Sequence, residues 1–265
     1  MPTAVTTENV GVAPSAVPRT RSLLAVLRAE GRLFLREPGS AFWVLLFPAA
    51  LLTIIGLIPS MREVSEDLGG RRVVDIYLPV VILLAMITAG VQVMAPLLAG
   101  YRERGVLRRM STTPVSPGVL LAAQMVINGV AMLVAAVLAT VVGGVGFDVP
   151  MPQNPVGHVL VLLLSLACSL SLGAALSALA RTTRAATTLG LLVYFPAMFT
   201  VGVWLPVQAM PDIFQSIVEF TPFGAASQAF DQASLGDWPS TGHLLVITVW
   251  TVLTTAVAVR FFRWE

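Results

Sequence analysis

The chain has 265 residues, of which 56% are hydrophobic and only 11% are charged. Soluble domains carry about 25% charged residues, so this composition excludes an ordinary soluble protein and indicates a polytopic membrane protein. The one cysteine, Cys168, lies in an apolar run, which excludes a disulfide framework and a cysteine-rich metal site.

The first part of the chain precedes the apolar segments. Residues 1–18 lack hydrophobic periodicity and are predicted to be a disordered cytoplasmic tail before a single transmembrane domain, 19–265. Residues 19–37 predict an amphipathic helix in the membrane interface, with arginines on one stripe and large apolar residues opposite. The two sets are Arg21, Arg28, Arg32 and Arg36, and Leu23, Val26, Leu27, Leu33 and Phe34. Glu30 falls within the apolar face, which this interpretation does not explain.

Six apolar segments follow, and each is long enough to cross a bilayer at ~1.5 Å per residue. The expected spans are 41–58, 76–99, 119–147, 158–180, 185–205 and 242–259. The segment 206–241 contains four prolines and two helix-like pieces too short to span, which we interpret as re-entrant helices between spans five and six. The predicted fold class is therefore an all-α membrane protein with six transmembrane helices.

Charge predicts the orientation of these spans. With the N-terminus inside, 13 of the 16 arginines lie on the inner side, and only Arg62, Arg71 and Arg72 lie outside. Cytoplasmic loops carry an excess of arginine and lysine, so both termini are expected in the cytoplasm of a multi-pass plasma-membrane protein.

The loop between spans two and three, 100–118, combines charge with an apolar side. Residues 103–109 have helical composition, and Pro114 biases Thr113 away from a helix, so a helix should stop near residue 111 or 112. Such a segment suits docking on a partner; the alternative is a generic positively charged loop held to anionic lipid. The residues concerned are Arg102, Glu103, Arg104, Gly105, Val106, Leu107, Arg108, Arg109, Met110 and Pro114.

The order E-x-G-V-L-x-x-M-x-x-T-P-V-S, from Glu103 to Ser116, resembles the cytoplasmic loop of ABC-2-type transporter permeases, the membrane subunits of bacterial ATP-binding-cassette exporters. The segment VWLPVQAMP…FTPFGAASQAF resembles the re-entrant region of the same family. The resemblance implies that the loop forms a coupling helix on a separate ATPase subunit and that the permease forms a homodimer or close heterodimer. It also implies an amphipathic substrate, with the antibiotic and multidrug resistance branch the most similar and polysaccharide or lipid exporters of the same fold the rival.

ATP must then be hydrolysed elsewhere. The phosphate-binding pattern G-x-x-x-x-G-K-[ST] needs a lysine, and the chain contains none. We expect ATP and Mg to be bound through the partner ATPase, with no cofactor, metal or catalytic residue in this chain. An ion-coupled secondary transporter is the alternative from another class, but it needs ionisable groups at mid-membrane, and the carboxylates lie outside the span centres.

Polar and aromatic residues within the spans are candidates for a substrate pathway. Amides at membrane depth face a bundle interior or a cavity, and interhelical hydrogen bonding is the alternative to substrate contact. Aromatic residues of span five form a possible wall for an amphipathic ligand, or else face lipid. The candidates are Gln92, Gln124, Asn128, Tyr194, Phe195 and Phe199. In span four, small residues at i+4 spacing predict close helix packing, within the subunit or across a dimer. They are Ser165, Ser169, Gly173 and Ser177.

Overall fold

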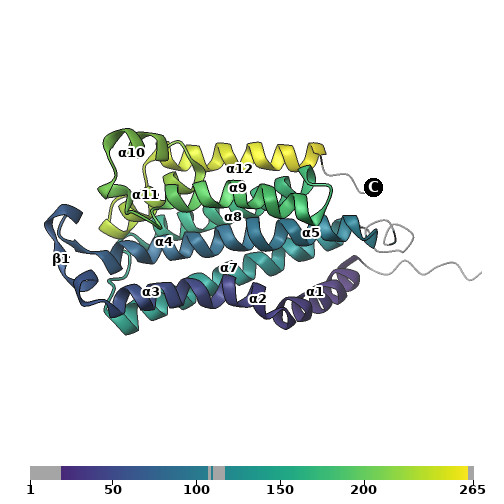
Figure 1. Ribbon diagram of the computed structural model, residues 1–265, viewed down its shortest axis with the longest axis horizontal. Helices are drawn as coiled ribbons and strands as arrows, with labels where there is room; N and C mark the ends of the chain where they lie inside the picture. Colours follow the sequence, from purple (N-terminus) through teal and green to yellow (C-terminus); the bar gives the residue numbers. More distant parts are fainter. Residues whose placement is uncertain (1–18, 107–108, 110–116, 262–265) are drawn as a thin grey trace, which may run out of the picture.

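The structure is a computed structural model that describes residues 19–106, 109 and 117–261. Six helices in this part of the chain are long and apolar enough to cross a membrane, which confirms the predicted six-span, all-α fold. They lie side by side along one axis (Figure 1). Their bounds are Pro38–Leu57, Val73–Glu103, Gly118–Phe147, Pro155–Leu179, Thr183–Val201 and Thr241–Phe261.

The helices preceding and linking these spans define the two ends of the bundle. The helix α1 (Arg19–Arg36) lies at one end, beside the last turn of α5 (Ala95–Glu103), and we call this the α1 end (Figure 1). The short helices α10 (Asp212–Val218) and α11 (Pro222–Leu235) lie at the other, the hairpin end. They correspond to the two short helices expected between spans five and six. The remaining long helices are α7 (Pro117–Phe147), α8 (Pro155–Leu179), α9 (Thr183–Val201) and α12 (Thr241–Phe261).

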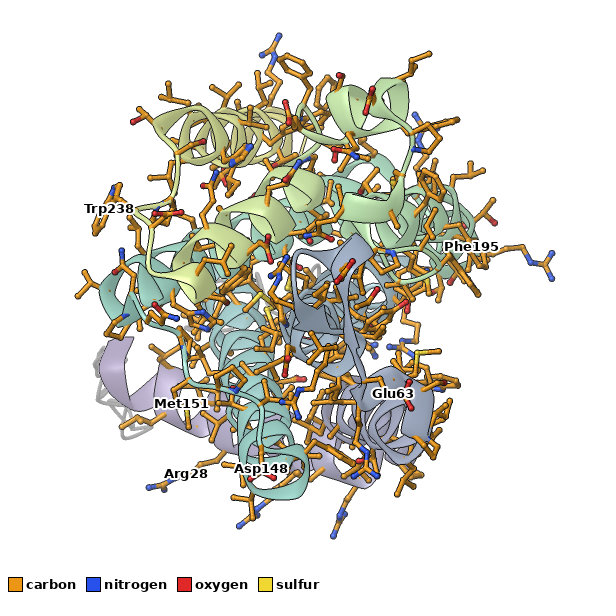
Figure 2. All side chains as sticks on the ribbon, turned by 90° about the vertical axis from the view of Figure 1, so that its left-hand side faces the viewer. Arg28, Glu63, Asp148, Met151, Phe195 and Trp238 are labelled. Atoms are coloured by element: carbon orange, nitrogen blue, oxygen red, sulfur yellow. The ribbon has the colours of Figure 1, made fainter. Side chains whose placement is uncertain are left out.

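The hairpin end also holds two short strands, in the stretch between the first two spans. The strands β1 (Val64–Ser65) and β2 (Arg71–Arg72) pair in antiparallel fashion. Arg71 forms a two-pronged ion pair with Asp231 of α11, and Arg72 donates to the carbonyl of Phe147 at the end of α7, at 3.1 Å. The hairpin thus ties the first two spans to α11 and α7. Figure 2 looks onto this end, with Glu63, Asp148, Met151 and Trp238 around its rim.

The second span is the most buried of the six and is the axis of the bundle. It runs through α4 (Val73–Ile87), a π-helical segment η4 (Thr88–Met94) and α5. The first span, α2 (Pro38–Ala41) and α3 (Phe47–Leu57), has a similar π-helical segment, η1 (Phe42–Leu46). Prolines stand just beyond both, at Pro48 and Pro96. A proline cannot donate to the carbonyl four residues back and clashes with it, and a wider turn relieves both problems.

The η4 segment packs very closely on α8. Ser169 donates to the carbonyl of Met86 at 2.5 Å. A Cβ atom at Gly90 would overlap the Ser169 backbone, and one at Gly173 would overlap the Gly90 carbonyl. The close packing predicted for the small residues of span four is therefore confirmed within the subunit.

Candidate functional site

Three consecutive residues in the last turn of α5 bind three different elements at the α1 end. Tyr101 contacts α1, Arg102 contacts the end of α8, and Glu103 contacts the start of α9. Successive residues of an α-helix point about 100° apart, so three neighbours reach partners on three sides. The loop that follows α5 is thereby connected to most of the bundle through one helical turn.

The Tyr101 contact belongs to a chain of buried polar groups. Its hydroxyl donates to Oε2 of Glu30 at 2.6 Å, and Gln124 Nε2 donates to the same oxygen at 2.7 Å. Asn128 in turn donates to the carbonyl and side-chain oxygens of Gln124 at 2.9 and 3.3 Å. Gln124 and Asn128 are buried, as is Tyr101. The network joins α1, α5 and α7, and it explains the carboxylate on the apolar face of α1.

Arg102 and Glu103 hold the turn between α8 and α9. Arg102 donates to the carbonyls of Ser177 and Ala180 at 3.1 and 3.0 Å, where the last carbonyls of α8 lack helical partners. Glu103 accepts from the backbone N–H and the hydroxyl of Thr183 at 2.8 and 2.7 Å. A carboxylate at a helix N-terminus binds free N–H groups and complements the positive end of the helix dipole.

The chain turns sharply directly after this helical turn. Gly105 has φ of 66°, a left-handed conformation that favours glycine, and a Cβ there would meet nothing within 4 Å. The structure therefore differs from the expected continuous helix over 103–109: Glu103 ends the span, and Val106 and Arg109 are helical beyond the turn. The other predicted coupling residues, Leu107, Arg108, Met110 and Pro114, lie outside the described residues.

Comparison with known families agrees with this architecture. The family model described as ABC-2 type transporter matches residues 21–234, most of the chain. This chain belongs to the ABC-2 type transporter family. It is a multi-pass plasma-membrane permease subunit of an ABC transporter, which has no ATPase site of its own and works with an ABC ATPase subunit. A comparison with curated proteins found no significant match.

The amides of the predicted substrate pathway fall into two separate places in the permease. Gln124 and Asn128 belong to the network with Glu30, so Gln124 makes the interhelical hydrogen bond considered as the alternative. Gln92 instead lines a cavity of about 230 Å³ at the α1 end, which the other two do not line. Contact of any of the three with substrate stays a prediction.

The aromatic candidates of span five divide between the interior and the surface. The Tyr194 hydroxyl lies 3.1 Å from the hydroxyl of Thr88 in η4. Phe195 is 56% exposed and points away from the bundle in Figure 2. Phe199 is 38% exposed and packs edge-on against Phe214 of α10. Only Tyr194 of these three therefore turns toward the second span.

Four residues with polar contacts or cavity positions at the α1 end were not among the sequence candidates. Glu30 and Tyr101 hold α1, Thr183 pairs with Glu103, and Glu37 lines the cavity beside Gln92. A signal existed for Glu30, since a lone carboxylate on an apolar helix face needs a buried partner. Nothing comparable in the local sequence marks the other three.

Proposed function

We propose that this permease exports an amphipathic small molecule, such as a drug, an antibiotic or a natural product, across a bacterial plasma membrane. The α1 end faces the cytoplasm with both chain termini, as the arginine distribution favours. The permease forms a dimer with a second copy or a close relative. ATP and Mg are bound by the ATPase subunit, which supplies the free energy for transport.

The coupling segment runs from Arg102 to Met110, with Pro114 closing it. The observation that carries this proposal is the turn Tyr101–Glu103, which binds α1, α8 and α9 where the segment begins. A displacement imposed by the ATPase on the segment therefore reaches three elements at once. The apolar residues predicted to meet a groove on the ATPase are Val106, Leu107 and Met110; of these, Val106 is half-buried and packs partly against the bundle itself. On this proposal, α1 lies along the cytoplasmic membrane interface.

The coupling role is tested with Leu107→Asp. Burying an unpaired polar group in an apolar contact costs roughly 2–7 kcal/mol, and burying an unpaired charge costs more. The variant should reach the membrane but lose the copurifying ATPase, or retain it without substrate-stimulated ATP hydrolysis. Val64→Asp is the matched control, because Val64 is 67% exposed on β1 at the opposite end. Wild-type copurification, ATP hydrolysis and transport in Leu107→Asp would refute the coupling role.

The orientation has a separate test. Cysteines introduced at Ser65 and at Ser111 should react with impermeant reagents from opposite sides of the membrane. The native Cys168 is 1% exposed and should not react in the folded protein. Reaction of both introduced cysteines from the outside would overturn the proposed topology.

A further inference from the structure

The cavity at the α1 end differs in chemistry from others of similar size in the bundle. A cavity of about 310 Å³ between α8, α9, α11 and α12, and one of about 300 Å³ between α4, α7 and α8, are lined almost wholly by apolar side chains. The α1-end cavity holds a carboxylate, a guanidinium, an amide and a hydroxyl. Those groups belong to Glu37, Arg104, Gln92 and Thr183, and its apolar wall is Val93, Pro96 and Leu97.

The two charged side chains that line this cavity do not form an ion pair with each other. Among the described residues, neither Glu37 nor Arg104 forms an ion pair. Arg104 instead lies over the ring of Tyr101, with its guanidinium carbon 5.7 Å from the ring centre. Both charged residues are exposed at the surface, so the cavity is accessible from the α1 end. Opposite charges that line one cavity without pairing leave room for a ligand that carries both signs.

The amide supplies an unmet donor at the same place. Gln92 Nε2 is buried and has no hydrogen-bond partner among the described residues. Gln92 lies in η4, the π-helical segment before Pro96, while Gly90 of the same segment packs on α8. π-Helical turns occur frequently at functional sites, because they shift one side chain out of the regular helical register. A buried amide donor without an acceptor is costly, and a ligand oxygen would satisfy it.

We infer that this cavity binds the zwitterionic head group of an amphiphile, a conclusion that rests on the proposed export function and names its substrate class. The anionic part of the head lies near Arg104 and Gln92, and the cationic part near Glu37. Glu37 would repel a purely anionic head, and Arg104 would repel a purely cationic one, so a head with a single charge binds less well. Cavities for whole drug-sized ligands measure roughly 300–1,000 Å³, so this smaller space holds a head group and the tail extends along Val93, Pro96 and Leu97.

Competition among amphiphiles with one tail and different heads tests the site. The full permease–ATPase complex, nucleotide-free in nanodiscs, is labelled with a photoreactive diazirine lysophosphatidylcholine. Dodecylphosphocholine, dodecyltrimethylammonium and dodecyl phosphate compete below their micellar concentrations. The phosphocholine should compete best, and the labelled peptides should come from η4, α5 and the start of α9.

Charge-neutral variants should then alter head-group preference in opposite directions. Glu37→Gln should weaken the trimethylammonium and phosphocholine competitors by roughly tenfold and favour the phosphate, and Arg104→Gln should do the reverse. Gln92→Leu should weaken the phosphocholine and phosphate competitors, because both lose the amide donor, and should leave the trimethylammonium unchanged. Arg28→Gln is the matched control, an exposed arginine on α1 that does not line the cavity. Unchanged melting temperatures verify that each variant is folded.

An unchanged competitor order in both Glu37→Gln and Arg104→Gln, or labelling confined to other helices, would overturn the site. If ATP-driven transport persists in that case, the export function stands and only the site fails. Conversely, the absence of any ATP-dependent outward transport by the wild-type complex refutes the export function and leaves the binding results intact. In sealed proteoliposomes, ATP-dependent movement of the probe supports a transported substrate, whereas binding without movement identifies a bilayer lipid and overturns the assignment of the zwitterionic head as the substrate class.

Discussion

Removing the carboxylate of Glu30 should release α1 from the transmembrane bundle. Glu30→Ala deletes the shared acceptor of hydrogen bonds from Tyr101 at 2.6 Å and Gln124 at 2.7 Å. Interhelical hydrogen bonds in membranes average ~0.6 kcal/mol and reach ~1.7 kcal/mol, whereas bonds to charged groups contribute about 1.5–3 kcal/mol. Both donors are buried. We therefore expect a loss of about 2–4 kcal/mol in the free energy of unfolding.

A graded series separates the two bonds. Glu30→Gln keeps an acceptor oxygen without the charge and should cost about half as much as Glu30→Ala. Tyr101→Phe removes one donor and should cost about 1–2 kcal/mol. Arg28→Ala changes an exposed residue of the same helix and should stay within about 0.5 kcal/mol of wild type.

The single cysteine provides the assay. Cys168 is 1% exposed, so a thiol-reactive dye reports its exposure when the purified protein melts in detergent. For a chain of this size a change of 1 kcal/mol shifts Tm by about 2–4 °C, which places Glu30→Ala roughly 4–16 °C below wild type. If Glu30→Ala melts at the same temperature as Arg28→Ala, then Glu30 does not hold α1 to the bundle. So would strictly additive effects of Glu30→Ala and Tyr101→Phe, because partners in one hydrogen bond couple by about 0.5 kcal/mol or more.

Three other pairs of substitutions test contacts elsewhere in the fold. Arg71→Ala and Asp231→Ala should show a coupling energy of about 1–2 kcal/mol in a double-mutant thermal-melting cycle. This exceeds the 0–1 kcal/mol typical of exposed ion pairs, because both side chains are largely buried. A coupling energy near zero would show that this ion pair does not hold the hairpin. Gly90→Ala should lower the free energy of unfolding by about 1–3 kcal/mol or more, because its Cβ would overlap the α8 backbone. Gly129→Ala is the control and should be neutral or stabilising in the same assay, because its Cβ would lie 3.7 Å from the nearest side chain. Gly105→Ala should impair ATPase copurification more than Gly105→Asn, since asparagine adopts the left-handed conformation more readily, and equal behaviour of the two would exclude a conformational role.

The spans were predictable because membrane crossing depends on local properties. A run of apolar residues with few charges can be recognised in the sequence without knowing what packs against it. All six expected spans have a corresponding helix. The π-helical segments were also within reach of local reasoning, because Pro48 and Pro96 each remove a backbone donor inside an apolar run. The small-residue stripe of span four likewise predicted a close helix contact, but it did not predict that η4 would be the partner.

The polar contacts were not predictable because their partners lie far apart in the chain. Glu30 could be recognised as anomalous, but its acceptor role depends on Tyr101 and Gln124, which lie 71 and 94 positions further on. Glu103 was expected to face a partner protein, whereas its carboxylate is bound to Thr183, 80 positions away. Charge and periodicity show that such a side chain needs a partner, and only the fold decides which one it finds.

Under the proposed coupling role, Gly105 lies between the docking segment and the bundle. Before it, Tyr101, Arg102 and Glu103 bind three elements through short hydrogen bonds, so the end of α5 moves together with α1, α8 and α9 or does not move. After it, the chain leaves the helix axis through a left-handed turn that contacts no other side chain at the position of a Cβ. The turn is itself held by hydrogen bonds, since the Gly105 N–H donates to the Arg102 carbonyl at 2.9 Å and Arg109 donates to the carbonyls of Gly105 and Arg104 at 3.1 and 3.2 Å. Under the proposed coupling role, a displacement of the docking segment is therefore passed through these bonds to the bound end of α5. The bound end of α5 and the left-handed turn at Gly105 would then act together, because a residue that cannot adopt this turn would shift the docking segment relative to α1, α8 and α9.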